Sequence, residues 1–125
     1  MNLYLDNDIS IANLFRAVSQ AELNDLTTFG GLRQKPDGLS YESKLFATSA
    51  KDAAYFGRIN YRLDIIIGLD NPFHIIEVSV PQFLIHRFEF RTLDFMPVVY
   101  VTEDLLPLLN RHAIIHEIPV IPLAR

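Results

Sequence analysis

Three positions in this sequence combine polar chemistry with apolar surroundings. Arg16 stands inside the apolar run Leu14–Val18, the hydroxyls of Thr48 and Ser49 follow a second apolar run, and Glu103 follows a third. An arginine buried without a partner costs free energy, so Arg16 requires either a protein carboxylate or a ligand phosphate. A carboxylate in a cleft can bind a ribose hydroxyl and stabilise the positive charge that develops on the adjoining carbon. These positions are therefore candidates for a site that binds a phosphorylated ribose.

Each of these side chains also has an ordinary structural role. Arg16 can form an ion pair with a carboxylate at the surface, and Ser49 can cap a helix. Glu103 suits the first turn of a helix, where the helix dipole favours negative charge. The residues alone leave both sets of roles open.

Other common chemistries find no support in the sequence. The chain has no cysteine, which excludes a disulfide framework, a thiolate metal site and a cysteine nucleophile. It has no glycine-rich phosphate loop, no GxGxxG, no HExxH and no GxSxG. His112 and His116 have the spacing of metal ligands on a helix, but we expect them around a strand with only Glu117 as a nearby carboxylate. We interpret them as surface histidines and predict no metal.

Composition and charge predict a single domain spanning residues 1–125. Half of the residues are hydrophobic and 21% are charged, so we expect the chain to fold around one core. The formal net charge is −4 and there is no run of basic residues, which disfavours nucleic acid and favours a protein partner. No signal peptide is recognisable and no apolar run approaches the length of a membrane span. We expect a soluble protein of the cytoplasm, or one delivered into the cytoplasm of a target cell, with no membrane partner.

Local patterns in the first half predict two strand–helix units joined by a turn over 35–38. In the first unit, a strand over 13–18 leads into the capping box Ser19-Gln20-Ala21-Glu22. The helix that follows is expected to end at Gly30-Gly31, with a left-handed residue at its C-terminus.

The second unit begins with a buried strand over 45–48. Ser49 then caps a short helix that Gly57 is expected to end. The rest of the chain is rich in strand patterns, and Thr102 is expected to cap a short helix over 103–109. We predict the remaining strands at 65–68, 74–80, 87–93, 98–101 and, at a sheet edge, 113–121. Helices segregated from runs of strands indicate the α+β class.

The order of these features resembles a known family. The segments LFRAVSQAELNDL, GGLRQKPDGLSYESKLFATSAKDAAYFG and HIIEVSVP are similar to the ADP-ribosyltransferase domains of bacterial polymorphic toxins, including effector domains related to toxins that act on translation elongation factor Tu. Those domains open with a strand ending in Tyr/Phe-Arg-Ala-Val/Met-Ser, then a helix with an acidic capping box. A glycine-containing loop and a segment similar to Lys-Tyr/Leu-Phe-Ala-x-Ser precede their Ala-rich helix. The resemblance is clearest over residues 14–57.

The resemblance implies an ADP-ribosyltransferase-like split β-sheet that holds NAD, as substrate, in a cleft between two small sheets. It also implies an Arg-Ser-Glu triad, which falls on Arg16, Ser49 and Glu103. Glu77 and Glu117 compete for the third position. The chain lacks the Glu-x-Glu pair of the arginine-modifying members, which leaves the acceptor residue open.

The implied activity is that of a toxin or effector that transfers ADP-ribose from NAD to a macromolecule, with a protein acceptor favoured. Arg16 would hold the nicotinamide-side ribose or phosphate, Ser49 or Thr48 would support the carboxylate, and Glu103 would stabilise an oxocarbenium-like transition state. A cognate immunity or antitoxin protein is a further implied partner. The alternative is a catalytically inactive α+β binding module. The residues expected to contact NAD are Arg16, Ala17, Tyr41, Phe46, Thr48 and Ser49.

Overall fold

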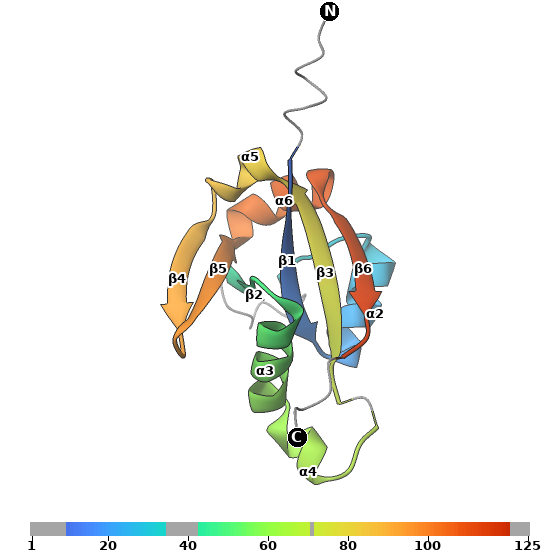
Figure 1. The fold of residues 1–125 in the computed structure, drawn as a ribbon. Coiled ribbons are helices and arrows are strands. Elements are labelled where there is room, and N and C mark those ends of the chain that lie inside the picture. The colour runs from blue at the N-terminus through green and yellow to red at the C-terminus, as the bar shows by residue number, and fades with distance from the viewer. Residues whose placement is uncertain (1–9, 35–42, 71, 121–125) are drawn as a thin grey trace, which may run out of the picture.

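A computed structural model describes residues 10–34, 43–70 and 72–120. In these residues six strands form one antiparallel sheet in the order β4-β5-β2-β1-β3-β6 (Figure 1). The α+β class is thereby confirmed. The strands are β1 Ile11–Val18, β2 Ser43–Ala47, β3 His74–Pro81, β4 Glu89–Leu93, β5 Met96–Thr102 and β6 Ile114–Ile118. The helices are α2 Gln20–Phe29, α3 Ala50–Asn60, α4 Arg62–Ile66, α5 Gln82–Ile85, the 3₁₀ turn η1 Glu103–Leu105 and α6 Leu106–His112.

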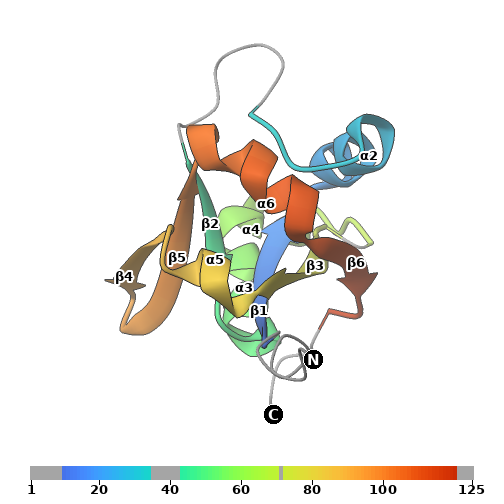
Figure 2. The ribbon, with the colours of Figure 1, turned by 90° about the horizontal axis from the view of Figure 1, so that it is seen from above.

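Alternating side chains divide the core between the two faces of the sheet. On one face, Leu14 and Val18 of β1 pack with buried residues of α5 and α6 and with partly buried leucines of α2. On the other face, Phe15 and Ala17 of β1 pack with residues of α3. Figure 2 shows α6 lying across the sheet beside α2. The period of two along β1 therefore separates a larger core from a smaller one.

The sheet consists of two three-stranded halves that meet at one residue pair. β1 pairs with β3 along its whole length, and all of β2 pairs with β5. In the described residues, the ladder between β1 and β2 has the single pair Phe15–Ala47. We call this pair the junction. Beyond it, toward Val18 on β1 and Ser43 on β2, the two strands separate.

The ends of α2 follow the predicted chemistry, with one correction. The Ser19 hydroxyl accepts the amide hydrogen of Glu22 at 3.0 Å, and Gly30 ends the helix in the left-handed region at φ 86°. The capping box also predicted that the Glu22 carboxylate turns back to the amide of Ser19. That part is wrong, because this carboxylate instead accepts hydrogen bonds from Arg16 and Lys44.

The start of α3 is confirmed, but its predicted end is wrong. The Ser49 hydroxyl accepts the amide hydrogen of Asp52 at 3.1 Å. The helix then runs through Gly57 to Asn60. A Cβ atom at Gly57 would overlap the ring of Phe73, so the glycine allows close packing instead of breaking the helix.

Two further boundaries differ from the predictions. Residues 65–68 were expected in a strand, but α4 occupies Arg62–Ile66 and its isoleucines are exposed. A short apolar run does not distinguish a strand from a helix, and here it follows α3 directly. The Thr102 hydroxyl donates to Asp104 and does not cap a helix. The helix predicted over 103–109 is instead the 3₁₀ turn η1 followed by α6. No helix of the described residues is long and apolar enough to cross a membrane.

The last strand is at a sheet edge, as predicted, but it is shorter. β6 covers Ile114–Ile118 and ends before Pro119. His112 belongs to α6, which runs past Pro107 because a proline in the first turn needs no amide donor. The predicted turn at 35–38 lies outside the described residues.

Gly57 provides a test of the packing between α3 and Phe73. Gly57→Ala should lower the free energy of unfolding by about 1–3 kcal/mol, because the new methyl group overpacks against the ring. Helix propensity alone favours alanine by about 1 kcal/mol, so the two effects have opposite signs. Urea denaturation measures the change, with exposed Lys51→Ala as the control. A stabilised Gly57→Ala variant would show that Phe73 does not constrain this position.

Ser49 provides a test of the helix cap. Ser49→Ala should lower the free energy of unfolding by about 1 kcal/mol, whereas Ser49→Asp should retain most of the cap. Thermal and urea denaturation of both variants measure the difference. Equal losses in the two variants would contradict the capping role.

Candidate functional site

Arg16 lies in the opening between β1 and β2, where it replaces missing ladder contacts. Counting on from the junction, a continued ladder would place Leu45 opposite Ala17. The strands have separated at this point, and the Arg16 Nη1 group donates to the Leu45 carbonyl oxygen at 3.0 Å. Its other two nitrogens donate to Glu22: Nε to Oε2 at 2.8 Å and Nη2 to Oε1 at 3.0 Å. One guanidinium therefore connects both halves of the sheet and the first turn of α2.

Lys44 joins this ion pair from β2. Its Nζ atom lies 3.4 Å from Oε2 of Glu22, and the side chains of Arg16, Glu22 and Lys44 are 19%, 20% and 11% exposed. We call these three residues the charge cluster. It holds two cations and one carboxylate, although the whole chain has a net charge of −4.

The electrostatics of the charge cluster reflect partial burial. Burial alone raises the pKa of Glu22, but the hydrogen bonds and positive charges of Arg16 and Lys44 outweigh it and hold that pKa below 4.5. Burial and the neighbouring charge of Arg16 lower the pKa of Lys44, and the charge of Glu22 compensates only in part. Glu22 is therefore ionised at neutral pH, and its charge balances only one of the two cations.

Tyr61 lies beside the charge cluster at the end of α3. Burial and the negative charge of Glu22 raise the pKa of its phenol, against smaller opposite effects of Arg16 and Ser19. Its ring stacks on Phe73 with centroids 5.9 Å apart. Sequence analysis identified neither Tyr61 nor Lys44. The alternation of Lys44 with buried Phe46 was the available signal for Lys44, since it predicts both side chains on one face.

A narrow slot reaches Arg16 from the α3 face of the sheet. It has a volume of about 20 Å³, roughly that of one water molecule. A nucleotide does not fit in this space, so a ligand would have to separate the walls. The slot is lined by Phe15, Arg16, Ala17, Leu45, Ala47, Phe56 and Asn60.

Thr48 and Ser49 follow the β2 residue of the junction, and Arg16 follows its β1 residue. Because the two strands are antiparallel, Arg16 and Thr48 lie on opposite sides of the junction, and the Arg16 side chain contacts Leu45 instead. Thr48 is exposed, and Ser49 uses its hydroxyl to cap α3. Phe46, expected to contact NAD, is fully buried in the core and offers no surface to a ligand. Tyr41, also expected there, lies outside the described residues.

Register separates Glu103 from Ser49 along β2. Glu103 follows Thr102, which pairs with Ser43 at the first residue of β2, whereas Ser49 lies beyond the last. Six residue steps from Ser43 to Ser49 span at most roughly 20 Å. The pairing of β2 with β5, which are distant in sequence, determines this separation, and the local pattern around Glu103 carries no information about it.

The two competing carboxylates have different surroundings. Glu77 lies opposite Phe15 in the β1–β3 ladder, and its Oε1 atom is 2.9 Å from Nε2 of His116. Glu117 lies 2.8 Å from Nδ1 of His74, whose other ring nitrogen contacts Gln20. Register therefore places Glu77 nearest to the junction among the three glutamates.

A carboxylate not considered from the sequence is Asp94. It lies in the turn between β4 and β5 with φ 52°, and it accepts a hydrogen bond from the Tyr55 hydroxyl at 3.4 Å. β5 runs antiparallel to β2, so this turn lies toward the same end of the sheet as Ser49.

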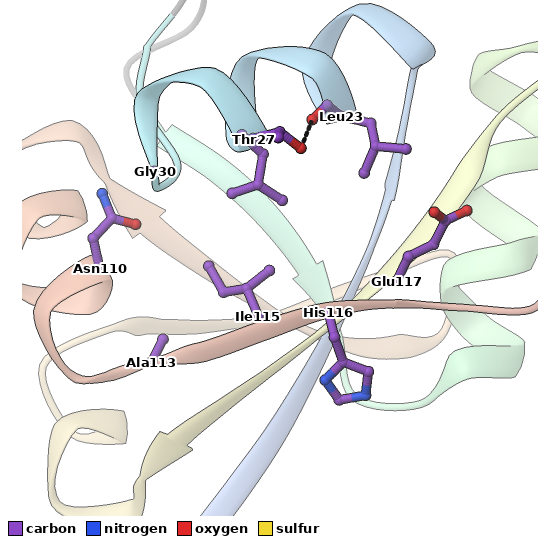
Figure 3. Close-up of a pocket in the computed structure, with 9 residues that line it drawn as sticks. Leu23, Thr27, Gly30, Asn110, Ala113, Ile115, His116 and Glu117 are labelled. Atoms are coloured by element: carbon purple, nitrogen blue, oxygen red, sulfur yellow. Dashed lines mark hydrogen bonds between the residues drawn. The ribbon is translucent and has the colours of Figure 1, made fainter.

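A larger cavity lies elsewhere, between α2 and β6 (Figure 3). Its volume is about 460 Å³, and Leu23 of α2 faces Ile115 of β6 across it. Its ionisable lining residues, His116 and Glu117, already contact Glu77 and His74. Its described lining contains no arginine or lysine to bind a phosphate, so we place the candidate site at the junction.

His112 and His116 both lie at the surface, His112 in α6 and His116 in β6. The ring of His112 packs edge-on against Phe83, and His116 contacts Glu77. Within the described part of the chain, no group of three or more His, Asp or Glu side chains is arranged to hold a metal ion.

Comparison with known proteins does not assign a family. No family model, no curated protein and no solved structure matches this chain.

The charge cluster should make the free energy of unfolding fall as the pH is lowered into the acid range. Because the pKa of folded Glu22 is depressed, its ionised form stabilises the fold above about pH 4.5, and this contribution is lost as the pH falls through the folded-state pKa. Glu22→Gln should therefore unfold more easily than the parent protein at pH 7, by about 1–3 kcal/mol. The difference should shrink as the pH falls toward about 3.

Urea denaturation at several pH values measures this difference. Glu89→Gln is the control, since Glu89 is paired with Arg91 at an exposed position of β4. A difference between Glu22→Gln and the parent protein that stays constant with pH would contradict the ionic role of Glu22.

Proposed function

We propose that this protein is an ADP-ribosyltransferase-like toxin or effector that transfers ADP-ribose from NAD to a protein acceptor. The observation that carries the proposal is the junction. Two three-stranded halves meet at Phe15–Ala47, with Arg16 on one side and Thr48 on the other. An arginine in the opening of a divided sheet, with a strand-end hydroxyl across the junction, is compatible with the arrangement that the sequence resemblance implies.

In the proposed reaction Arg16 binds a phosphate or the nicotinamide-side ribose of NAD through its planar fork. The glycosidic bond to nicotinamide breaks, the bonding electrons leave with nicotinamide, and an acceptor nucleophile attacks the ribosyl carbon. A carboxylate stabilises the positive charge on the ribose during this step. We propose Glu103 for this role, because it follows β5 where β5 pairs with β2 beside Lys44. Glu77 lies opposite Phe15, so its side chain is on the other face of the sheet from that of Arg16.

NAD would have to open the slot between the two halves. One residue pair offers little resistance to such a movement compared with a continuous ladder. The acidic surface balance favours a protein acceptor over nucleic acid. A cognate immunity or antitoxin protein remains part of the proposal.

A second candidate is a catalytically inactive α+β binding module. Two observations favour it: Glu22 and the Leu45 carbonyl occupy all three nitrogens of Arg16, and the slot is closed. A relative that kept the fold and lost the reaction would have these features.

NAD binding and transfer separate the two candidates. Millimolar NAD should raise the melting temperature, because a ligand that binds only the folded state stabilises it. Incubation with labelled NAD and a cell lysate should label a protein. Arg16→Lys should abolish both effects, since lysine keeps the charge but loses the fork. Arg91→Lys, in exposed β4, is the matched control. If NAD neither raises the melting temperature nor leads to labelling in the lysate, the transferase proposal is wrong and the inactive binding module is the remaining candidate.

The carboxylate has its own test. Glu103→Gln should lower turnover by orders of magnitude and change NAD affinity little, the pattern of an interaction made mainly in the transition state. Glu77→Gln, whose carboxylate pairs with His116, should retain turnover. Initial rates over a range of NAD concentrations measure both constants. The reverse result would assign the role to Glu77.

A further inference from the structure

The charge cluster has more positive charge than its own carboxylate balances. Arg16 and Lys44 both contact Glu22, and Lys44 is 11% exposed. The other carboxylate near Lys44 is Asp25, which makes a two-nitrogen contact with Arg33 at 2.6 to 3.2 Å. Tyr61 faces the cluster as a neutral phenol with a raised pKa. Among the residues that the structure describes, these two partly buried cations therefore share one carboxylate.

The contact between Glu22 and Arg16 has the geometry of an oxyanion bound to a fork. Two carboxylate oxygens accept from Nε and Nη2, and a phosphate offers the same pair of oxygens. A phosphate carries more negative charge than a carboxylate, so it would also balance Lys44. Glu22 lies in the first turn of α2, a helix without a fully buried residue, and its side chain can turn away without disrupting a packed core.

We infer that Arg16 and Lys44 form a binding site for the pyrophosphate of a nucleotide, and that Glu22 occupies this site until the ligand displaces it. The inference rests on the proposed function for its ligand and adds two residues to it. Lys44 is a second phosphate-binding residue. Glu22 is an internal competitor that keeps the site closed in the absence of ligand.

Inorganic pyrophosphate tests the site without any transfer reaction. Its dissociation constant is measured by calorimetry at constant ionic strength for the parent protein and for Glu22→Gln and Lys44→Met. Glu22→Gln should bind about tenfold more tightly because the competing anion is gone, and pyrophosphate should restore its lost thermal stability. Lys44→Met should bind about tenfold more weakly while keeping the apolar stem of the side chain. Glu89→Gln and Lys51→Met lie outside the charge cluster, serve as controls and should bind like the parent protein.

Two results would overturn the inference. One is equal pyrophosphate affinity in the parent protein, Glu22→Gln and Lys44→Met. The other is a Glu22→Gln variant that is destabilised but not restored by pyrophosphate, which would make the charge cluster purely structural. Lysate labelling that persists in the parent protein under either result keeps the transferase proposal and removes only this site. Tight pyrophosphate binding in a protein that labels nothing in the lysate keeps this site and removes the transferase proposal.

Discussion

Arg16 is partly buried at the point where β1 and β2 separate, and a guanidinium withdrawn from water must find partners for its donors. The Leu45 carbonyl has lost its ladder partner at the same point and accepts one donor. Glu22 accepts the other two, which draws the first turn of α2 against the sheet. The separation of the strands and the position of α2 therefore depend on one another through a single side chain.

The same contacts are compatible both with a structural ion pair and with a phosphate-binding site. A closed ion pair stabilises the fold, and it also holds an arginine and a lysine ready for a phosphate. Displacement of Glu22 exchanges one anion for another, so the cations need not become unpaired during binding. The cost of opening falls on the slot walls, where Phe56 and Asn60 of α3 cover the junction. In an active enzyme the binding of the ligand would supply the free energy needed to separate these walls, and in an inactive relative it would not.

The features that depend on neighbouring residues alone were predicted correctly from the sequence. The caps at Ser19 and Ser49, the end of α2 at Gly30 and most strands agree with the structure. The isoleucines of α4 were misassigned because a short apolar run has no decisive period. Gly57 was taken as a helix end because its packing partner, Phe73, is distant in sequence. The sequence predicted that Arg16 has a carboxylate or a phosphate as its partner, but it did not identify Glu22. The separation of Glu103 from Ser49 depends on the pairing register of the strands, which no local pattern contains.

A crystal structure of the protein with NAD would show directly whether a phosphate replaces Glu22 on Arg16. We predict that the pyrophosphate lies against Arg16 and Lys44, that the Glu22 carboxylate has left the guanidinium, and that α3 has moved away from the junction. NAD bound in the groove between α2 and β6, with the Arg16–Glu22 contact intact, would contradict this prediction.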